Sequence, residues 1–212
     1  MCGLLGEIYL KKLDQFNLPK FKKSLNLLHH RGPDDTKIIY DKNYIFGFKR
    51  LSIQDLSNQA SQPMMTKDKN YILMLNGEIY NFKDLKKNLE KKGFNFLTSS
   101  DTEVLLYGLI SEGIEFVKKC NGMFSFCFYD KLKNIFYLFR DRVGIKPLYY
   151  SIIKKKIIFS SEVPPILMLE PSLKQLNIES ISSYFSYRYP INNKSYFKNI
   201  LSLEPGHFIK IT

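Results

Sequence analysis

Apolar side chains recur every three or four residues in several stretches of the chain, the spacing that places them on one face of a helix. These stretches are residues 16–30, 82–92 and 102–112, and a fourth helix is predicted over 177–187. Arg31-Gly32-Pro33 follows the first stretch and Gly93 follows the second, and both are typical of a helix end. Asp101 stands in position to cap the first turn of the third helix.

Other apolar stretches have the patterns of strands. Residues 123–129 place phenylalanines on one face, and both faces of 135–139 are apolar or aromatic. The short polar connection from Asp130 to Asn134 predicts that these two strands form an antiparallel hairpin. A second hairpin is predicted for 148–153 and 157–160. Strands that are apolar on both faces need cover on both sides, so we predict two antiparallel sheets packed face to face with helices outside, a layered α+β sandwich.

Length and composition fit one globular domain. The chain has 212 residues, of which 44% are hydrophobic and 25% charged, so wholesale disorder is not expected. The longest apolar candidate, Leu105 to Ile114, is interrupted by Gly108 and falls short of the roughly 18 residues of a membrane helix. The N-terminus has no basic segment followed by an apolar stretch. We therefore expect a cytoplasmic protein without a membrane span.

Cysteine usage and charge exclude further classes. Cysteines stand only at positions 2, 120 and 127, without a CxxC pair, which argues against a disulfide framework and a zinc site. The net charge of +12 suggests nucleic-acid binding. However, only five of the 32 basic residues are arginines, and the lysines are scattered in short runs typical of solvent-facing side chains. We expect neither a metal site nor a nucleic-acid partner.

Cys2 directly follows the initiator Met1. Removal of Met1 would leave one residue with both a thiol and a free α-amino group. The pKa of such an amine is roughly 7.7–8.0, so it can act as general base for its own side chain. The alternative is an inert cysteine that begins a strand, and position alone favours it.

Asn76-Gly77-Glu78 follows the apolar run from Tyr71 to Leu75. One interpretation is a hairpin turn, for which Asn-Gly is a strong signal. The other is an oxyanion site, in which the Asn76 side-chain amide and the Gly77 main-chain amide are the donors.

Arg50 and Asp101 are candidates for binding the charged ends of a substrate. An arginine in a lysine-dominated chain suggests a planar grip on a carboxylate, with a structural salt bridge as the alternative. Asp101 could accept from a substrate ammonium or cap a helix, and the cap is favoured in isolation.

Nine short motifs follow one another along the chain: MCGLLG at 1–6, HRGPD at 30–34, RLSI at 50–53, QPM at 62–64, NGEIYN at 76–81, SDTE at 100–103, GMF at 122–124, RDRVGIKPLYY at 140–150 and PGH at 205–207. In this order they resemble the class II glutamine amidotransferases over essentially the whole chain. The RLSI and DRVGIKPLYY motifs resemble the asparagine synthetase branch in particular. The resemblance implies the N-terminal nucleophile hydrolase fold, a four-layer αββα sandwich, which agrees with the layered sandwich predicted above.

The resemblance also implies a mechanism. Cys2 would attack the side-chain amide of glutamine with its own α-amine as base, and Asn76 and Gly77 would form the oxyanion hole. A thioester forms, ammonia leaves for a separate synthetase site, and water releases glutamate. The glutamine-binding residues would be Arg50 for the α-carboxylate, Glu78 and Asp101 for the α-ammonium, and backbone groups of Leu51, Ser52, Ile53 and Gln54.

By the same resemblance, residues 1–212 correspond to the glutaminase domain, and no SGGxDS-type loop for ATP is present. We expect no cofactor in this domain, and ATP and Mg²⁺ only in a missing synthetase domain, which would pass the ammonia to aspartate. A homodimer of the isolated domain is possible. Two departures from the family pattern, Gln59-Ala60-Ser61 and Ser161-Glu162-Val163-Pro164-Pro165, lie outside the glutamine contacts. The second loses a lysine and stiffens the chain with prolines.

Two alternatives stay open. One is the glutaminase half of another amidotransferase, acting on a different acceptor. The other is a non-catalytic scaffold or basic binding module with the same fold. The presence of all the site residues weighs against the second.

Overall fold

The computed structural model of the chain describes residues 1–13 and 15–212. The strands are β1 (Gly3–Tyr9), β2 (Asp35–Asp41), β3 (Tyr44–Arg50), β4 (Met64–Met65), β5 (Tyr71–Ile79), β6 (Gly122–Asp130), β7 (Ile135–Arg140), β8 (Tyr149–Ile153), β9 (Lys156–Ser160), β10 (Leu201–Ser202) and β11 (Phe208–Ile211). The helices are α1 (Leu18–Asn26), α2 (Phe82–Glu90), α3 (Asp101–Glu112), α4 (Val163–Leu169) and α5 (Ile178–Tyr187). Short 3₁₀ segments are η1 (His29–Arg31), η2 (Asn58–Ala60), η3 (Gly113–Lys119) and η4 (Pro171–Leu173).

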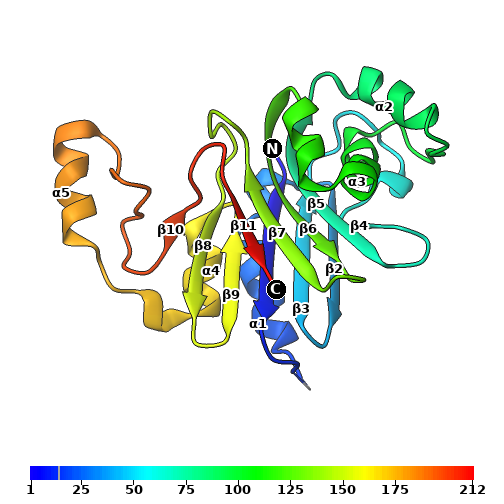
Figure 1. Cartoon of the computed structure of the whole chain (residues 1–212). Coiled ribbons are helices and arrows are strands. Elements are labelled where there is room, and N and C mark those ends of the chain that lie inside the picture. The colour runs from blue at the N-terminus through cyan, green and yellow to red at the C-terminus, as the bar shows by residue number, and fades with distance from the viewer. Residues whose placement is uncertain (14) are drawn as a thin grey trace.

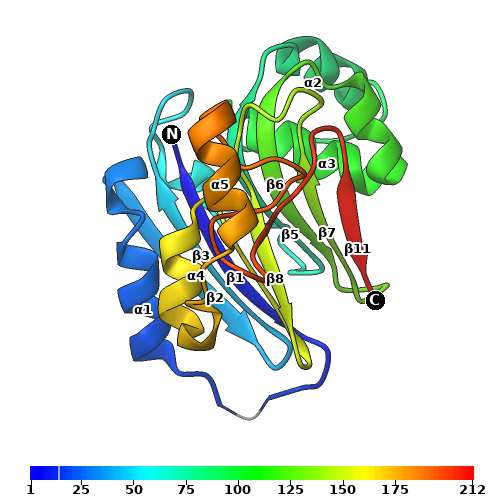
Figure 2. The same cartoon turned by 90° about the vertical axis from the view of Figure 1, so that its left-hand side faces the viewer.

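The strands form two antiparallel sheets. One has the order β10-β8-β9-β1-β3-β2 and the other the order β11-β7-β6-β5-β4. Helices α1 and α4 cover the outer face of the first sheet, and α2 and α3 cover the outer face of the second (Figures 1 and 2). The layers therefore run helix, sheet, sheet, helix, and the predicted four-layer α+β sandwich is confirmed. Both predicted hairpins, β6–β7 and β8–β9, are present.

Neighbouring residues of one strand point into different layers of the core. In β1, Leu4 packs between the two sheets, whereas Leu5 packs beneath α1 and α4. In β6, Phe126 packs beneath α2 and α3, whereas Cys127 lies between the sheets. All four side chains are almost fully buried. This arrangement explains why these strands are apolar on both faces, as the sequence pattern required.

The predicted helices differ from the observed ones mainly at the first. Helices α2, α3 and α5 lie within two residues of their predicted bounds, but α1 is shorter than 16–30. It begins after Asn17, whose side chain accepts a hydrogen bond from the Lys20 amide at 3.1 Å, and Pro19 stands in its first turn. After α1 the chain tightens into η1, so the end of the predicted stretch is a 3₁₀ turn.

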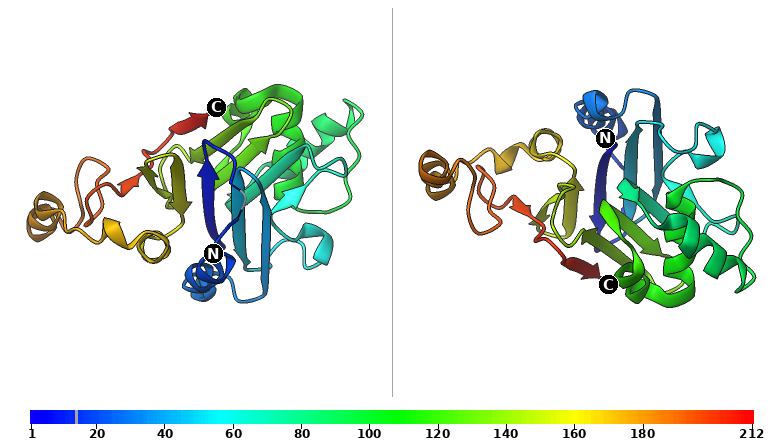
Figure 3. Two further views of the ribbon diagram at one scale, coloured as in Figure 1. Left: turned by 90° about the horizontal axis from the view of Figure 1, so that it is seen from below. Right: turned by 90° about the horizontal axis from the view of Figure 1, so that it is seen from above.

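Helix α4 was not predicted. Pro164 and Pro165 were interpreted as a stiffened connection, but they stand in the first turn of α4. In that turn the missing N–H groups have no intrahelical partner to lose, and the fixed φ of proline suits the helix. Ile166 and Leu169 then bury the inner face of α4 against the first sheet. Helix α5 instead stands away from the sandwich, as both views of Figure 3 show.

Segments that are far apart in the sequence meet at the end of the sandwich that carries the N-terminus (Figure 1). Cys2 directly precedes β1, Arg50 ends β3, and Asp101 begins α3. Asn76 and Gly77 lie near the end of β5. The fold therefore brings the candidate residues to one place, although up to 99 positions separate them in the chain.

Candidate active site

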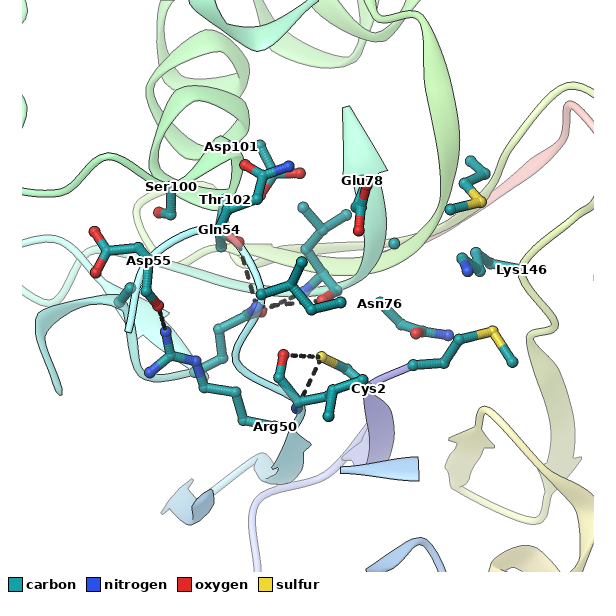
Figure 4. Close-up of a pocket in the computed structure, with 18 residues that line it drawn as sticks. Cys2, Arg50, Gln54, Asp55, Asn76, Glu78, Ser100, Asp101, Thr102 and Lys146 are labelled. Carbon is teal, nitrogen blue, oxygen red and sulfur yellow. Dashed lines mark hydrogen bonds between the residues drawn. The ribbon is translucent and has the colours of Figure 1, made fainter. Parts of the chain in front are cut away.

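A cavity of about 190 Å³ opens at this end of the sandwich. Figure 4 shows its lining, to which the two residues before β1, strands β3, β5 and β6, helix α3 and the connections after β3 and β7 contribute. Eight of the predicted site residues besides Cys2 line it: Arg50, Leu51, Ile53, Gln54, Asn76, Gly77, Glu78 and Asp101. Ser52 does not line it, and its main-chain N–H donates to Asp34 Oδ2 at 2.7 Å.

The Cys2 thiol lies against the main chain of Leu51. The Leu51 N–H donates to Cys2 Sγ at 3.4 Å, and the thiol donates to the Leu51 carbonyl at 3.6 Å. Burial raises the pKa of the thiol above its ordinary value, so a base is needed to form the thiolate at neutral pH. The Arg31 Nε–H fixes the Cys2 carbonyl at 3.0 Å. While Met1 is attached, the Cys2 nitrogen is part of a peptide bond and cannot supply that base.

Asn76 and Gly77 lie inside β5, so the hairpin-turn interpretation is wrong. Pairing between β5 and β6 runs without a break from Tyr71 to Ile79. Asn76 is fully buried, and its Nδ2 and Oδ1 atoms have no hydrogen-bond partner among the described residues. Buried amides are almost always paired, so this carboxamide is available to a ligand in the cavity.

Gly77 has a backbone conformation that favours glycine, with φ +149°. A Cβ atom at this position would lie 2.1 Å from the Met123 carbonyl oxygen of the neighbouring strand. The close approach of β6 therefore leaves no room for a side chain at position 77, directly after Asn76.

Arg50 holds the loop of residues 51–57 that forms one wall of the cavity. Its Nη1 donates to the Ser57 carbonyl at 3.0 Å, and its Nη2 donates to the Asp55 carbonyl. No carboxylate of the described residues forms a salt bridge with this guanidinium, which does not support the salt-bridge alternative. The loop is anchored at a second point, where Asp55 Oδ2 accepts from the Ser99 N–H at 2.8 Å. Hydrogen bonds from Ser57 and Ser99 lower the pKa of Asp55 to about 2.

Asp101 is not the helix cap, because Ser100 caps α3 and accepts from the Glu103 N–H at 3.3 Å. The Asp101 carboxylate instead accepts from the Ile79 N–H at 2.8 Å. Burial raises the pKa of Asp101 to about 6, and the negative charge of Glu78 acts in the same direction. Two carboxylates that face one small cavity are costly without a counter-ion, so this side of the cavity favours a cation.

Lys146 and Gln62 also line the cavity, although no role was predicted for either. Lys146 is 4% exposed, and burial lowers the pKa of its ammonium. Its place is fixed by the turn after β7, where the buried Asp141 carboxylate accepts the Lys146 N–H at 3.0 Å and the Gly144 N–H at 2.7 Å. The only sequence signal for these residues was their presence in the QPM and DRVGIKPLYY motifs.

Two further properties concern the described part of the chain alone. Within it, no three His, Cys, Asp or Glu side chains are grouped so that they could hold a metal ion. None of its helices has the length and apolarity needed to cross a bilayer.

Comparison with known proteins agrees with this geometry. The sequence model of a family described as "Glutamine amidotransferase domain" matches residues 1–212. The chain is 38% identical over 218 residues to asparagine synthetase [glutamine-hydrolyzing] 2 of Bacillus subtilis, covering 100% of this chain and 29% of that protein. It is also 38% identical over 225 residues to the putative asparagine synthetase [glutamine-hydrolyzing] 2 of Methanocaldococcus jannaschii, covering 96% and 42%. The chain thus spans less than half the length of these relatives.

A solved structure has the same fold. The glutamine phosphoribosylpyrophosphate amidotransferase of Bacillus subtilis superposes with a TM-score of 0.64 at 20% sequence identity. The superposition covers 79% of this chain and 43% of that one. At this identity the likeness establishes the sandwich architecture.

Proposed function

The chain belongs to the glutamine amidotransferase domain family, and from this premise we propose that it hydrolyses the side-chain amide of glutamine with Cys2 as the nucleophile. One observation supports this proposal above the others. The Cys2 thiol shares a small cavity with the Asn76 carboxamide, which has no hydrogen-bond partner among the residues that the structure describes. A nucleophile beside a free buried donor is the arrangement that acyl transfer requires.

The charges around the cavity suit the two ends of an amino acid. Arg50 offers a cation on one side, and Glu78 and Asp101 offer carboxylates on another. We propose that Arg50 binds the α-carboxylate of glutamine and that the two carboxylates bind its α-ammonium. Main-chain groups of Leu51 and of its neighbours in the loop would complete the pocket. Bound in this way, glutamine would place its side-chain amide at Cys2.

The reaction begins only when Met1 has been removed. The free α-amine of Cys2 then takes the thiol proton, and the sulfur forms a bond to the amide carbon of glutamine. The oxyanion that develops is stabilised by the Asn76 side-chain amide and the Gly77 N–H. Each such donor is worth about 2.7–4 kcal/mol in the transition state.

Collapse of this intermediate breaks the carbon–nitrogen bond of the glutamine side chain. The protonated α-amine of Cys2 gives its proton to the departing nitrogen, which leaves as ammonia. The product on the enzyme is a thioester between Cys2 and the glutamyl side chain. The amine then deprotonates a water molecule that attacks the thioester, and glutamate is released with the thiol restored. No metal or organic cofactor takes part in this scheme.

We further propose that residues 1–212 are a glutaminase domain that delivers its ammonia to an ATP-dependent synthetase. The two relatives are named as glutamine-hydrolysing asparagine synthetases. Their much greater length leaves room for a second domain, to which we assign the binding of ATP and Mg²⁺. We also assign to it the acceptor of the ammonia, which the likeness to asparagine synthetases suggests is aspartate. The glutaminase chemistry proposed above does not depend on the identity of the acceptor.

Ammonia release from glutamine tests the glutaminase proposal. Intact mass should show a chain without Met1, and this chain should produce equal amounts of glutamate and ammonia. Cys2→Ala should abolish the reaction while the circular dichroism spectrum is unchanged. Glutaminase activity that survives in folded Cys2→Ala would overturn the assignment of the nucleophile.

A further inference from the structure

The side chain of Gln62 makes hydrogen bonds to β5 at the place where the main chain of β4 would make them if the strand continued. Strand β4 pairs with β5 through Met64↔Leu73 and Met65↔Ile72. Continued by two residues, this antiparallel register would place Gln62 opposite Leu75, but β4 has ended and Pro63 has no N–H to donate. The Gln62 side-chain amide takes over: its Oε1 accepts from the Leu75 N–H at 2.6 Å, and its Nε2 donates to the Leu75 carbonyl at 3.2 Å.

Two ties therefore join β5 to the start of α3, one on each side of the Asn76–Gly77–Glu78 segment. Before it, Gln62 Nε2 bonds Leu75 and also donates to Thr102 Oγ1 at 3.3 Å. After it, the Ile79 N–H donates to the Asp101 carboxylate at 2.8 Å. The segment that carries the oxyanion donors is held at both ends against the helix that carries Asp101.

Asn76 depends on its backbone for its position. Neither polar atom of its side chain is held by another described residue. On one edge of β5 the backbone is fixed by β6, where Asn76 pairs with Ser125. On the other edge of β5, past the end of β4, the Gln62 side chain hydrogen-bonds to the main chain of Leu75, the residue before Asn76. Gln62 is 6% exposed, so water does not readily replace these bonds.

We propose that Gln62 is a positioning residue of the glutaminase site, which holds β5 so that Asn76 and Gly77 meet the developing oxyanion. The inference rests on the proposed function. The side-chain amide of Gln62 is engaged by Leu75 and Thr102, so its effect on the reacting atoms passes through Leu75. A misplacement of about 1 Å at a reacting centre can cost on the order of 100-fold in rate.

Gln62→Leu and Gln62→Glu test this role, with Gln59→Leu as the matched control on an exposed residue. In Gln62→Leu we expect kcat to fall about 10- to 100-fold while KM changes less than about threefold. Alkylation of Cys2 by iodoacetamide, which needs no oxyanion donor, should keep its rate. Backbone hydrogen exchange at Leu75 and Asn76 should accelerate, and Gln59→Leu should match the wild type throughout.

Gln62→Glu separates positioning from bulk stability, because a protonated carboxyl keeps the acceptor for the Leu75 N–H and one donor for the Leu75 carbonyl, and loses only the second donor, to Thr102 Oγ1. Once ionised, it faces the Leu75 carbonyl with a second acceptor. The activity of Gln62→Glu relative to the wild type should therefore be highest at low pH and decline as the pH rises through the pKa of the new carboxyl.

The outcomes are distinguishable. An inactive wild type would refute the proposed function. An active wild type with unchanged kcat in Gln62→Leu would refute the positioning role alone. So would a rise in KM at constant kcat, unchanged hydrogen exchange at Leu75, or a Gln62→Glu profile parallel to that of the wild type.

Discussion

Asp101→Asn should make the protein more stable near neutral pH and a poorer enzyme. The pKa of Asp101 is about 6, against 3.8 for an ordinary aspartate, chiefly because the carboxyl is buried. Since the folded-state pKa is raised, folding favours the protonated form, and stability declines as the pH rises from about 4 to about 6. The difference corresponds to about 3 kcal/mol, which ionised Asp101 costs the folded state at every pH above this window.

An asparagine at this position keeps an acceptor for the Ile79 N–H but carries no charge. We therefore expect Asp101→Asn to raise the free energy of unfolding at pH 8 by up to about 3 kcal/mol, with the gain shrinking to near zero at pH 4. The same change removes a charged partner of the substrate ammonium. Charged hydrogen bonds are worth about 1.5–3 kcal/mol, so KM for glutamine should rise about 10- to 100-fold.

Urea unfolding of both proteins at several pH values between 4 and 8 checks the stability, and steady-state kinetics at pH 8 check KM. Asp84→Asn, an exposed residue, serves as the control for a lost surface charge. A variant less stable than the wild type at pH 8, or a stability difference that does not depend on pH, would refute the claim that Asp101 is held ionised against its burial.

Three further substitutions probe the other walls of the cavity. Gly77→Ala should lower kcat at least about 100-fold, because the new Cβ would lie 2.1 Å from the Met123 carbonyl oxygen and force the two strands apart; kinetics beside circular dichroism would show this, and near-normal kcat would contradict it. Arg50→Lys should raise KM for glutamine about 10-fold or more and lower the melting temperature, because one ammonium cannot bind the two loop carbonyls and the substrate carboxylate at once. A melting temperature that calorimetry finds unchanged would show that Arg50 does not hold the loop of residues 51–57. Lys146→Met should move the pH dependence of Cys2 alkylation to higher pH, because a buried positive charge that shares the cavity with the thiol is lost; an unchanged profile would show that the two groups do not interact.

The layers of the fold were predictable because the spacing of apolar residues along a strand or helix shows which of its faces are buried. Phe126 and Cys127 occupy the two faces of one strand, and the pattern showed that both faces need cover. Helix α4 escaped prediction because proline is compatible with both a stiff loop and the first turn of a helix, and tertiary packing decided between them.

In isolation Cys2 and Asp101 favoured an inert cysteine and a helix cap, and the candidate site was predictable from the order of the nine motifs along the chain. Asn76-Gly77 has the composition of a turn, yet pairing with β6 draws both residues into a strand. Asp101 was expected as a cap, but Ser100 takes that role one residue earlier. The place of Gln62 depends on strand register, which no local pattern in the sequence determines.

The assignment of Cys2 as an N-terminal nucleophile is tested most directly by labelling with 6-diazo-5-oxo-L-norleucine, a reactive analogue of glutamine, followed by peptide mass mapping. The chain without Met1 should gain one adduct, located on Cys2, and glutamine should slow its formation. A chain that retains residues before Cys2 should react far more slowly, because its base is held in a peptide bond. An adduct on Cys120, Cys127 or elsewhere, or equal labelling with and without Met1, would contradict the assignment.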